Sequence, residues 1–398
     1  MSRQPLYEVY LKTDEGMRGT VVEGITGIEI LYRKNEPSKW TLSGSSLGEC
    51  PIAETASLLI FRNGVCALSG YVEKIELAYD AATRIYDWEV SGLSDLGRLN
   101  DRLGWVIPTS ATPKFDDNEY KDEGRLSDIL LTLANVNGGP QAQQIRQISG
   151  LTFGTLPRLG DDTTIGVEYD KILDYIQEKL EDSGLVLRET WDGSSGAWAV
   201  VIAEPGDVSE KIVFSVESGS ISSWKRTVAK PKGNWLLVKG CKNKDTDETL
   251  SVIVSDADSI EKWGRIELTV SRSDIKQIVE KDDDGNVTYT EPWSSVQSRL
   301  QEAAYEELEK ASAQYGYELT ILDIDRFAYK TDWDLNDIVA VRIGSEQFTA
   351  QIEEVKLSVS NGVETVTPSV GTIQKGELQT VFDTLGELKE QIKVLQKE

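Results

Sequence analysis

The sequence IDRFAYKTDWDLNDIV, residues 324–339, lies inside a strand-rich region from Tyr317 to Val370. Its central residues, 332–337, separate an apolar strand from a second apolar run that starts at Ile338. Asn336 is suited to a tight turn there, because asparagine tolerates a positive φ better than most residues with a side chain. Asp334 and Asp337 form a carboxylate pair in this loop. A solvated strand-edge loop is preferred over a catalytic pair for glycoside cleavage.

The first hundred residues read as about seven short strands. Tyr7, Val9 and Leu11 alternate on one face of the first of them. The dipeptide Asn63-Gly64 lies between two apolar runs, which is the strongest short-range signal for a β-hairpin. Short strands at this spacing predict a small β-barrel or sandwich for residues 1–98.

The middle of the chain mixes helices with strands. Residues 99–165 read as a connector of loops with one helix, and residues 166–222 as an α+β insert. The insert contains an amphipathic helix, because apolar residues recur at helical spacing; these are Tyr169, Ile172, Leu173, Ile176 and Leu180. Residues 223–318 read as a β-rich domain with a hairpin over 275–291 and a long helix over 294–315. The predicted fold class is therefore mainly β, with α+β insertions and several domains.

The C-terminal segment, residues 374–398, carries a heptad pattern. Its apolar residues recur in steps of 3, 4, 3, 4 and 3, which is the spacing of a coiled-coil seam; they are Leu378, Val381, Leu385, Leu388, Ile392 and Leu395. An isolated helix of this length is marginally stable in water. We therefore expect it to order against copies of itself or against a partner protein.

Composition excludes several classes of function. The chain has 398 residues, a formal charge of −25 and no histidine, so it cannot use a Ser-His-Asp or Cys-His nucleophile. Cys50, Cys66 and Cys241 are too widely separated for a thiolate zinc site, and they suggest a reducing compartment. A disulfide between Cys50 and Cys66 across neighbouring strands stays open. The acidic balance disfavours specific nucleic-acid binding.

Targeting signals are not recognisable in the sequence. No apolar run reaches the roughly 18 residues of a membrane span, and the N-terminus lacks the apolar core of a signal peptide. We therefore expect synthesis in the cytoplasm, no membrane insertion and no cofactor.

One acidic loop partly matches a calcium-binding pattern. With Gly285 at position 6 of an EF-hand loop, the ligand positions fall on Glu280, Asp282, Asp284 and Glu291. However, residues 275–279 alternate as a strand does, and the two flanking helices of an EF-hand are not both visible. A hairpin tip is therefore the preferred interpretation, and calcium binding is the alternative.

Residues 324–339 resemble a recurring pattern of phage tail proteins, in which an apolar strand leads to a turn of the form D-aromatic-D-L-G-D-x-V. That turn is formed here by Asp332, Trp333, Asp334, Leu335, Asn336 and Asp337, with Asn336 where the pattern has glycine. The pattern closes at P-x-(I/V)-G, here residues 368–371. The chain therefore resembles the baseplate or tail-tip hub proteins of long-tailed, non-contractile bacteriophages, the siphophage tail-hub family.

The resemblance implies a homotrimer at the tail tip of a virion. Two small β-barrel tube domains, residues 1–98 and 319–373, would lie side by side and continue the hollow tail tube. The implied partners are a distal tail protein or the tail tube above, and a tip fibre, spike or receptor-binding protein below. Three copies of a −25 chain would line the lumen with negative charge, so that DNA passes without specific binding.

Two alternatives remain at the level of sequence. One is a β-rich carbohydrate-active enzyme or adhesin on the virion tip that acts on host cell-wall glycans. It would need a deep cleft with two inward carboxylates about 5–10 Å apart. The other is a structural protein of a contractile injection particle with the same fold.

Overall fold

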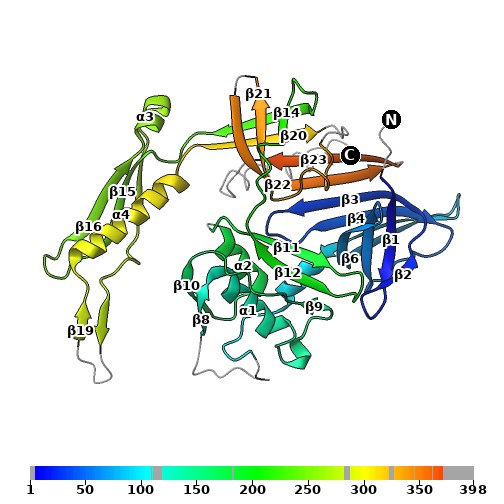
Figure 1. Ribbon diagram of the computed structural model, residues 1–398, viewed down its shortest axis with the longest axis horizontal. Coiled ribbons are helices and arrows are strands. Elements are labelled where there is room, and N and C mark those ends of the chain that lie inside the picture. Colours follow the sequence, from blue (N-terminus) through cyan, green and yellow to red (C-terminus); the bar gives the residue numbers. More distant parts are fainter. Residues whose placement is uncertain are drawn as a thin grey trace. The chain divides into compact units, whose positions relative to one another are not determined.

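The computed structural model describes residues 5–108, 110, 119–181, 183–281, 287–321, 327–344, 346–360 and 362–370. Two units make up the chain. Unit 1 comprises Met1–Lys225 and Glu318–Gly371, and unit 2 comprises Arg226–Tyr317 and Thr372–Glu398. Most regular structure in both is β-strand, which confirms the mainly β class (Figure 1).

The N-terminal part of unit 1 is a series of antiparallel strands: β1 (Tyr7–Lys12), β2 (Arg18–Val21), β3 (Ile25–Arg33), β4 (Lys39–Ser46), β5 (Ser57–Arg62), β6 (Val65–Asp80) and β7 (Ile85–Ser94). The hairpin at Asn63-Gly64 is confirmed, because both residues have a positive φ and join β5 to β6. Alternate residues such as Ile30, Leu42 and Val90 are fully buried. Sequence alternation therefore sets which strand face forms the core.

The C-terminal strands of unit 1 extend the same sheet. They are β21 (Ile338–Ile343), β22 (Glu346–Ser360) and β23 (Val363–Val370). Strand β22 pairs antiparallel with β3, and the register places Val355 opposite Tyr32 and Leu357 opposite Ile30. The strand order runs β14-β20-β23-β22-β3-β4-β7-β6-β5-β1-β2, with β14 at Ile221–Ala229, β20 at Gln314–Ile321, and β13 (Val213–Ser215) paired to β21. The two terminal regions thus lie side by side, and their closure into two barrels stays a prediction.

Between these strand groups lies the α+β region of unit 1. It contains η1 (Asp95–Asp101), β8 (Tyr120–Arg125), α1 (Leu126–Gly138), η2 (Gln144–Arg146), β9 (Leu151–Thr152), β10 (Asp162–Val167), α2 (Ile172–Glu181), β11 (Val186–Trp191) and β12 (Trp198–Ala203). One hydrophobic cluster extends from Leu96 to Ile202. The expected connector, 99–165, and the start of the expected insert, 166–222, therefore share a single core.

Helix α2 begins later than its apolar spacing predicts. Tyr169 is not helical: its φ is +62°, and its backbone N–H donates to the Gly104 carbonyl at 3.1 Å. This hydrogen bond to a neighbouring segment keeps the backbone non-helical before Ile172, where α2 begins. The remaining predicted positions, Ile172 to Leu180, lie on the buried face.

Unit 2 is a three-stranded sheet with a long helix on one face. Its elements are β15 (Trp235–Lys242), β16 (Thr249–Ser255), α3 (Ala257–Trp263), β17 (Glu267–Ser271), β18 (Val279–Lys281), β19 (Val287–Thr290) and α4 (Trp293–Lys310). The strand order is β16-β15-β17, and α4 lies across β15 and β16 (Figure 1). Helix α4 ends at Lys310, before the predicted 315, because residues from Gln314 onward form β20. None of the described helices is both long and apolar enough to span a bilayer.

Candidate functional site

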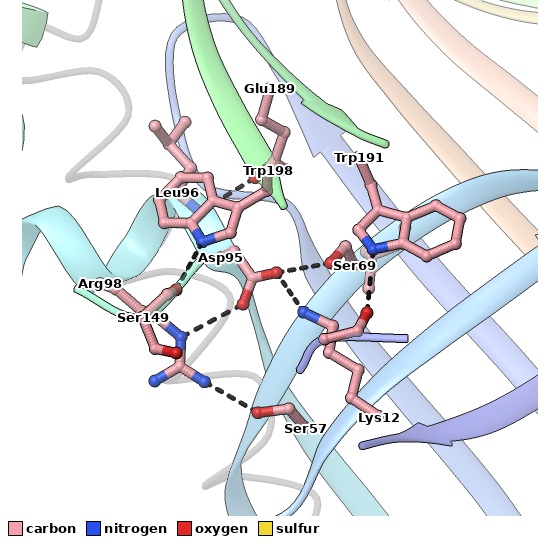
Figure 2. Close-up of polar contacts among 12 residues, drawn as sticks. Lys12, Ser57, Ser69, Asp95, Leu96, Arg98, Ser149, Glu189, Trp191 and Trp198 are labelled. Carbon is pink, nitrogen blue, oxygen red and sulfur yellow. Dashed lines mark hydrogen bonds and ion pairs between the residues drawn. The ribbon is translucent and has the colours of Figure 1, made fainter. Parts of the chain in front are cut away.

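A buried polar cluster joins the N-terminal strands to the α+β region inside unit 1 (Figure 2). Its centre is Asp95 at the start of η1, whose side chain is 2% exposed. The Asp95 carboxylate accepts hydrogen bonds from the Lys12 ammonium on β1 and the Ser69 hydroxyl on β6. Arg98 Nε donates to it at 3.2 Å, and Arg98 Nη2 donates to Ser57 Oγ at 2.9 Å. We call Lys12, Ser69, Asp95, Arg98 and Glu189 the junction cluster.

Glu189 brings β11 into the junction cluster. Its Oε2 accepts the Leu96 backbone N–H at 2.9 Å. Burial of the carboxyl raises the pKa of Glu189 to about 7, the charge of Asp95 adds to that rise, and hydrogen bonds from Ser94 and Leu96 oppose it. A carboxyl group that titrates near neutrality therefore lies between two parts of unit 1.

Two turns, at Gly16 and Gly196, also lie very close together at this junction. Trp191 Nε1 donates to the Gly16 carbonyl at 3.1 Å (Figure 2). A Cβ on Gly16 would lie 2.3 Å from the Gly196 carbonyl oxygen, so only glycine fits. Lys12 and Asp95 are already paired with each other, which leaves neither free to act on a substrate. The junction cluster is suited to fixing the orientation of two parts of unit 1.

The predicted turn at 332–337 has the expected geometry. Asn336 adopts a φ of +73°, and its N–H donates to the Ile352 carbonyl of β22 at 2.8 Å. Asp332 accepts the Ala328 N–H at 2.8 Å, and Asp337 accepts the Asp334 N–H at 2.8 Å. The acidic residues of this motif are therefore turn-forming acceptors.

Trp333 anchors that turn in the core. It is 2% exposed, and its Nε1 donates to the Phe327 carbonyl at 2.9 Å. Its ring packs against Phe214, with centroids 5.6 Å apart, and against Tyr329 at 4.9 Å. Leu335, the remaining motif residue, lies between the acidic positions and is half-buried.

The pair Asp334 and Asp337 is engaged within the protein. Lys330 Nζ lies 2.8 Å from Asp334, and Arg188 Nη2 lies 3.9 Å from Asp337 Oδ1. Burial raises the pKa of Asp337. Within the described residues, no group of three or more Cys, Asp or Glu side chains is arranged to hold a metal ion.

Asn336 gives a test of this turn. The change Asn336→Gly should keep or raise the free energy of unfolding, because glycine adopts a positive φ without steric cost. The change Asn336→Val should lower it by about 1–2 kcal/mol. Urea unfolding of both variants measures the difference. Equal stabilities for the Gly and Val variants would show that the positive φ is not required.

Of the candidate calcium ligands, Glu291 is already hydrogen-bonded to groups of the protein. Arg299 donates to its two oxygens at 3.0 and 2.6 Å, and the Ile278 N–H donates at 3.0 Å. These bonds lower the pKa of Glu291 to about 2. Glu280 lies on β18, which pairs with β19 in the expected antiparallel hairpin. Asp282 and Asp284 lie outside the described residues, so calcium binding stays untested.

Sequence reasoning missed the ion pair between Arg62 and Glu364. Arg62 on β5 donates to the Glu364 carboxylate on β23 through Nε at 2.8 Å and Nη2 at 2.7 Å. The Tyr7 hydroxyl donates to the same carboxylate. Because the partners are 302 residues apart, no local pattern marks them.

The six heptad residues of the C-terminal segment lie outside the described residues. All three cysteines are free thiols, so Cys50 and Cys66 form no disulfide.

Three solved structures of tail proteins share this fold. The chain is similar to the 43 kDa tail protein of prophage MuSo2 from Shewanella oneidensis, with a TM-score of 0.57 and 15% identity over 92% of this chain and 96% of that one. A tail protein from Neisseria meningitidis MC58 gives 0.56 and 12% over 92% and 97%. The prophage tail protein gp18 from Listeria monocytogenes gives 0.56 and 11% over 96% and 99%. The fold is thus that of phage tail proteins.

The chain belongs to the Siphovirus ReqiPepy6 Gp37-like protein family, whose model matches residues 18–372. This membership, together with the shared fold, confirms the resemblance to bacteriophage tail proteins. Comparison with curated proteins finds no match.

Proposed function

We propose that the chain is the structural hub of a siphovirus tail tip, where three copies form a ring that continues the tail tube. The observation that carries the proposal is the pairing of β22 with β3. It joins the first and last strand groups of the chain edge to edge, as two neighbouring tube domains in each subunit require. Family membership and the tail-protein fold support the same role.

The charge of the chain fits a conduit for DNA. Three copies of −25 give about −75 for the ring. A negatively charged lumen repels the phosphate backbone, so DNA passes without sticking. The ring would contact a distal tail protein or the tail tube on one side, and a tip fibre, spike or receptor-binding protein on the other.

The proposed role is not catalytic. The chain has no histidine, and the carboxylates of the Asp334–Asp337 pair are already engaged, Asp334 with the Lys330 ammonium and Asp337 with the Asp334 N–H. The competing function is a glycan-degrading enzyme or adhesin. Incubation of the purified chain with host cell-wall polymer distinguishes the hub from such an enzyme: the hub releases no soluble sugar, and substantial hydrolysis would refute it.

The heptad segment gives the assembly test. Replacing both Leu385 and Leu388 with Asp places charge in the seam. The double variant should keep its β-domains folded, as judged by circular dichroism and thermal unfolding, and should abolish tail assembly in a phage that lacks its own copy. The matched control replaces Lys389 and Lys393, on the polar face, with Asp and should assemble tails. Complete tails from the Leu variant would show that the heptad segment is dispensable.

A further inference from the structure

The outer strand of the unit 2 sheet has an open edge. Strand β16 is the terminal strand in the order β16-β15-β17. Asp256 N–H donates to the Asn234 carbonyl, and Val254 and Val252 follow at two-residue steps opposite Leu236 and Val238. In an antiparallel pair, hydrogen-bonded positions alternate. The main-chain groups of Val252 and Val254 therefore face β15, and those of Ser251, Ile253 and Ser255 face outward. Within the described residues, no strand pairs with that side.

Apart from one irregularity in the register between Lys239 and Lys242 of β15, strand β16 lacks the features that usually protect an edge. Its sequence, TLSVIVS, contains no charge and no proline, and Ile253 is 57% exposed. Natural sheets protect edges with Lys, Pro, short strands or bulges. The opposite edge follows that rule, because β17 is a five-residue strand that begins with Glu267 and lies between Arg265 and Arg272. The contrast within one sheet points to β16 as an edge that receives another strand.

Helix α4 offers an additional surface beside the free edge of β16. It packs more on β16 than on β15, so a strand added at the β16 edge would lie next to the helix. Arg299 and Glu307 contact residues that follow β17, namely Lys276 and Arg272, and mark the β17 side of α4. The opposite flank of α4 carries no charge and consists of the exposed Gln297 and Gln301 and the half-buried Leu308, with the buried Ala304 between them and the core. An added strand would therefore meet uncharged side chains from the helix as well.

We propose that the β16 edge of unit 2 binds an extended strand donated by a neighbouring tail protein, an inference that rests on the proposed tail function. The donated strand is uncharged over about seven residues. Its apolar side chains lie on the α4 face of the sheet, and small polar side chains lie on the opposite face. Its ends carry Lys or Arg, because the acidic residues Glu248 and Asp256 flank β16. Main-chain hydrogen bonds supply the affinity, and the alternating side chains supply the specificity.

A second copy of β16 is a poorer occupant. Two identical edges pair antiparallel about a twofold axis, whereas the proposed ring is threefold. Centred on Val252, such a pairing would also place Glu248 of one copy directly opposite Asp256 of the other. Like charges directly opposite on paired strands are destabilising.

Residue-resolved hydrogen exchange on the purified chain and on purified tails tests the proposal. The outward amides of Ser251, Ile253 and Ser255 should exchange at least tenfold more slowly in tails, whereas Val252 and Val254 should be protected in both. Tails that lack the chain by mass spectrometry would refute the proposed function. Tails that contain it with unprotected outward amides would refute the strand site alone. Protection that rises with concentration in the purified chain would identify a second copy as the occupant and overturn the proposal.

A variant pair tests the edge directly. Ile253→Pro removes the outward N–H that β15 does not use, so the sheet should form while incorporation into tails falls at least tenfold. Ile253→Thr keeps the N–H and should be incorporated normally. Should the Pro variant unfold, Ser251→Lys adds a charge to the exposed edge without removing a bond, and the same loss is expected. Normal incorporation of a folded Pro or Lys variant would contradict the proposal.

Discussion

Arg62→Leu should lower the free energy of unfolding of unit 1 by about 3–5 kcal/mol, because it leaves the buried Glu364 carboxylate without its cationic partner. The side chains of Arg62 and Glu364 are 13% and 2% exposed. Two hydrogen bonds of 2.8 and 2.7 Å join them across β5 and β23. Arg62 Nη1 also donates to the Tyr329 carbonyl at 3.2 Å. The pair therefore connects the first strand group with the last.

Urea unfolding measures this loss, and two comparisons isolate its cause. The double variant Arg62→Leu, Glu364→Leu should be more stable than Arg62→Leu alone, because it removes the unpaired charge as well. The exposed pair Lys74–Glu76 has a similar N–O distance of 2.8 Å, but its side chains are 64% and 58% exposed. Lys74→Ala should cost less than about 1 kcal/mol. A similarly small cost for Arg62→Leu would show that the two strand groups do not depend on this ion pair.

Glu189→Gln should change how stability depends on pH. The pKa of Glu189 rises from 4.5 to about 7 on folding, so between these pH values the folded state binds more protons than the unfolded state. The free energy of unfolding of the natural chain therefore falls as pH rises through that window. Glutamine stays neutral and can still accept the Leu96 N–H. As pH rises from 5 to 8, the free energy of unfolding of the variant should therefore increase by about 2 kcal/mol relative to that of the natural chain.

Unfolding of both proteins at pH 5, 6, 7 and 8 gives the comparison. The expected difference is near zero at pH 5 and largest at pH 8. The exposed residue Glu73 provides the control, because Glu73→Gln removes one carboxylate that lies outside the junction cluster. If the stability of Glu189→Gln runs parallel to that of the natural chain from pH 5 to pH 8, the Glu189 carboxyl is ionised in the folded protein throughout this range.

Local sequence patterns were enough to predict several elements. The Asn63-Gly64 hairpin follows from two residues that accept a positive φ, and most of α2 follows from its apolar spacing. The turn at Asn336 was predicted because asparagine can replace glycine at a positive φ. Each of these features depends on residues close together in the chain, where propensity and periodicity act directly.

Contacts between residues far apart in the chain could not be predicted from local sequence patterns. The register of β22 against β3 joins Val355 to Tyr32, and an alternating strand is compatible with many partners. The pKa of the Glu189 carboxyl is raised only when β11 packs into unit 1 and buries that group, next to the charge of Asp95. The start of α2 was wrong for a similar reason, because Tyr169 bonds to Gly104, which is 65 residues earlier in the chain. Tertiary contacts overrode the local pattern in each case.

The mass of the purified chain in solution, combined with negative-stain images, tests the proposed ring most directly. The hub account predicts a particle of three times the 44.1 kDa chain mass, with a central hole in end-on views. A mass of one chain at every concentration, or a trimer without a central hole, would contradict it.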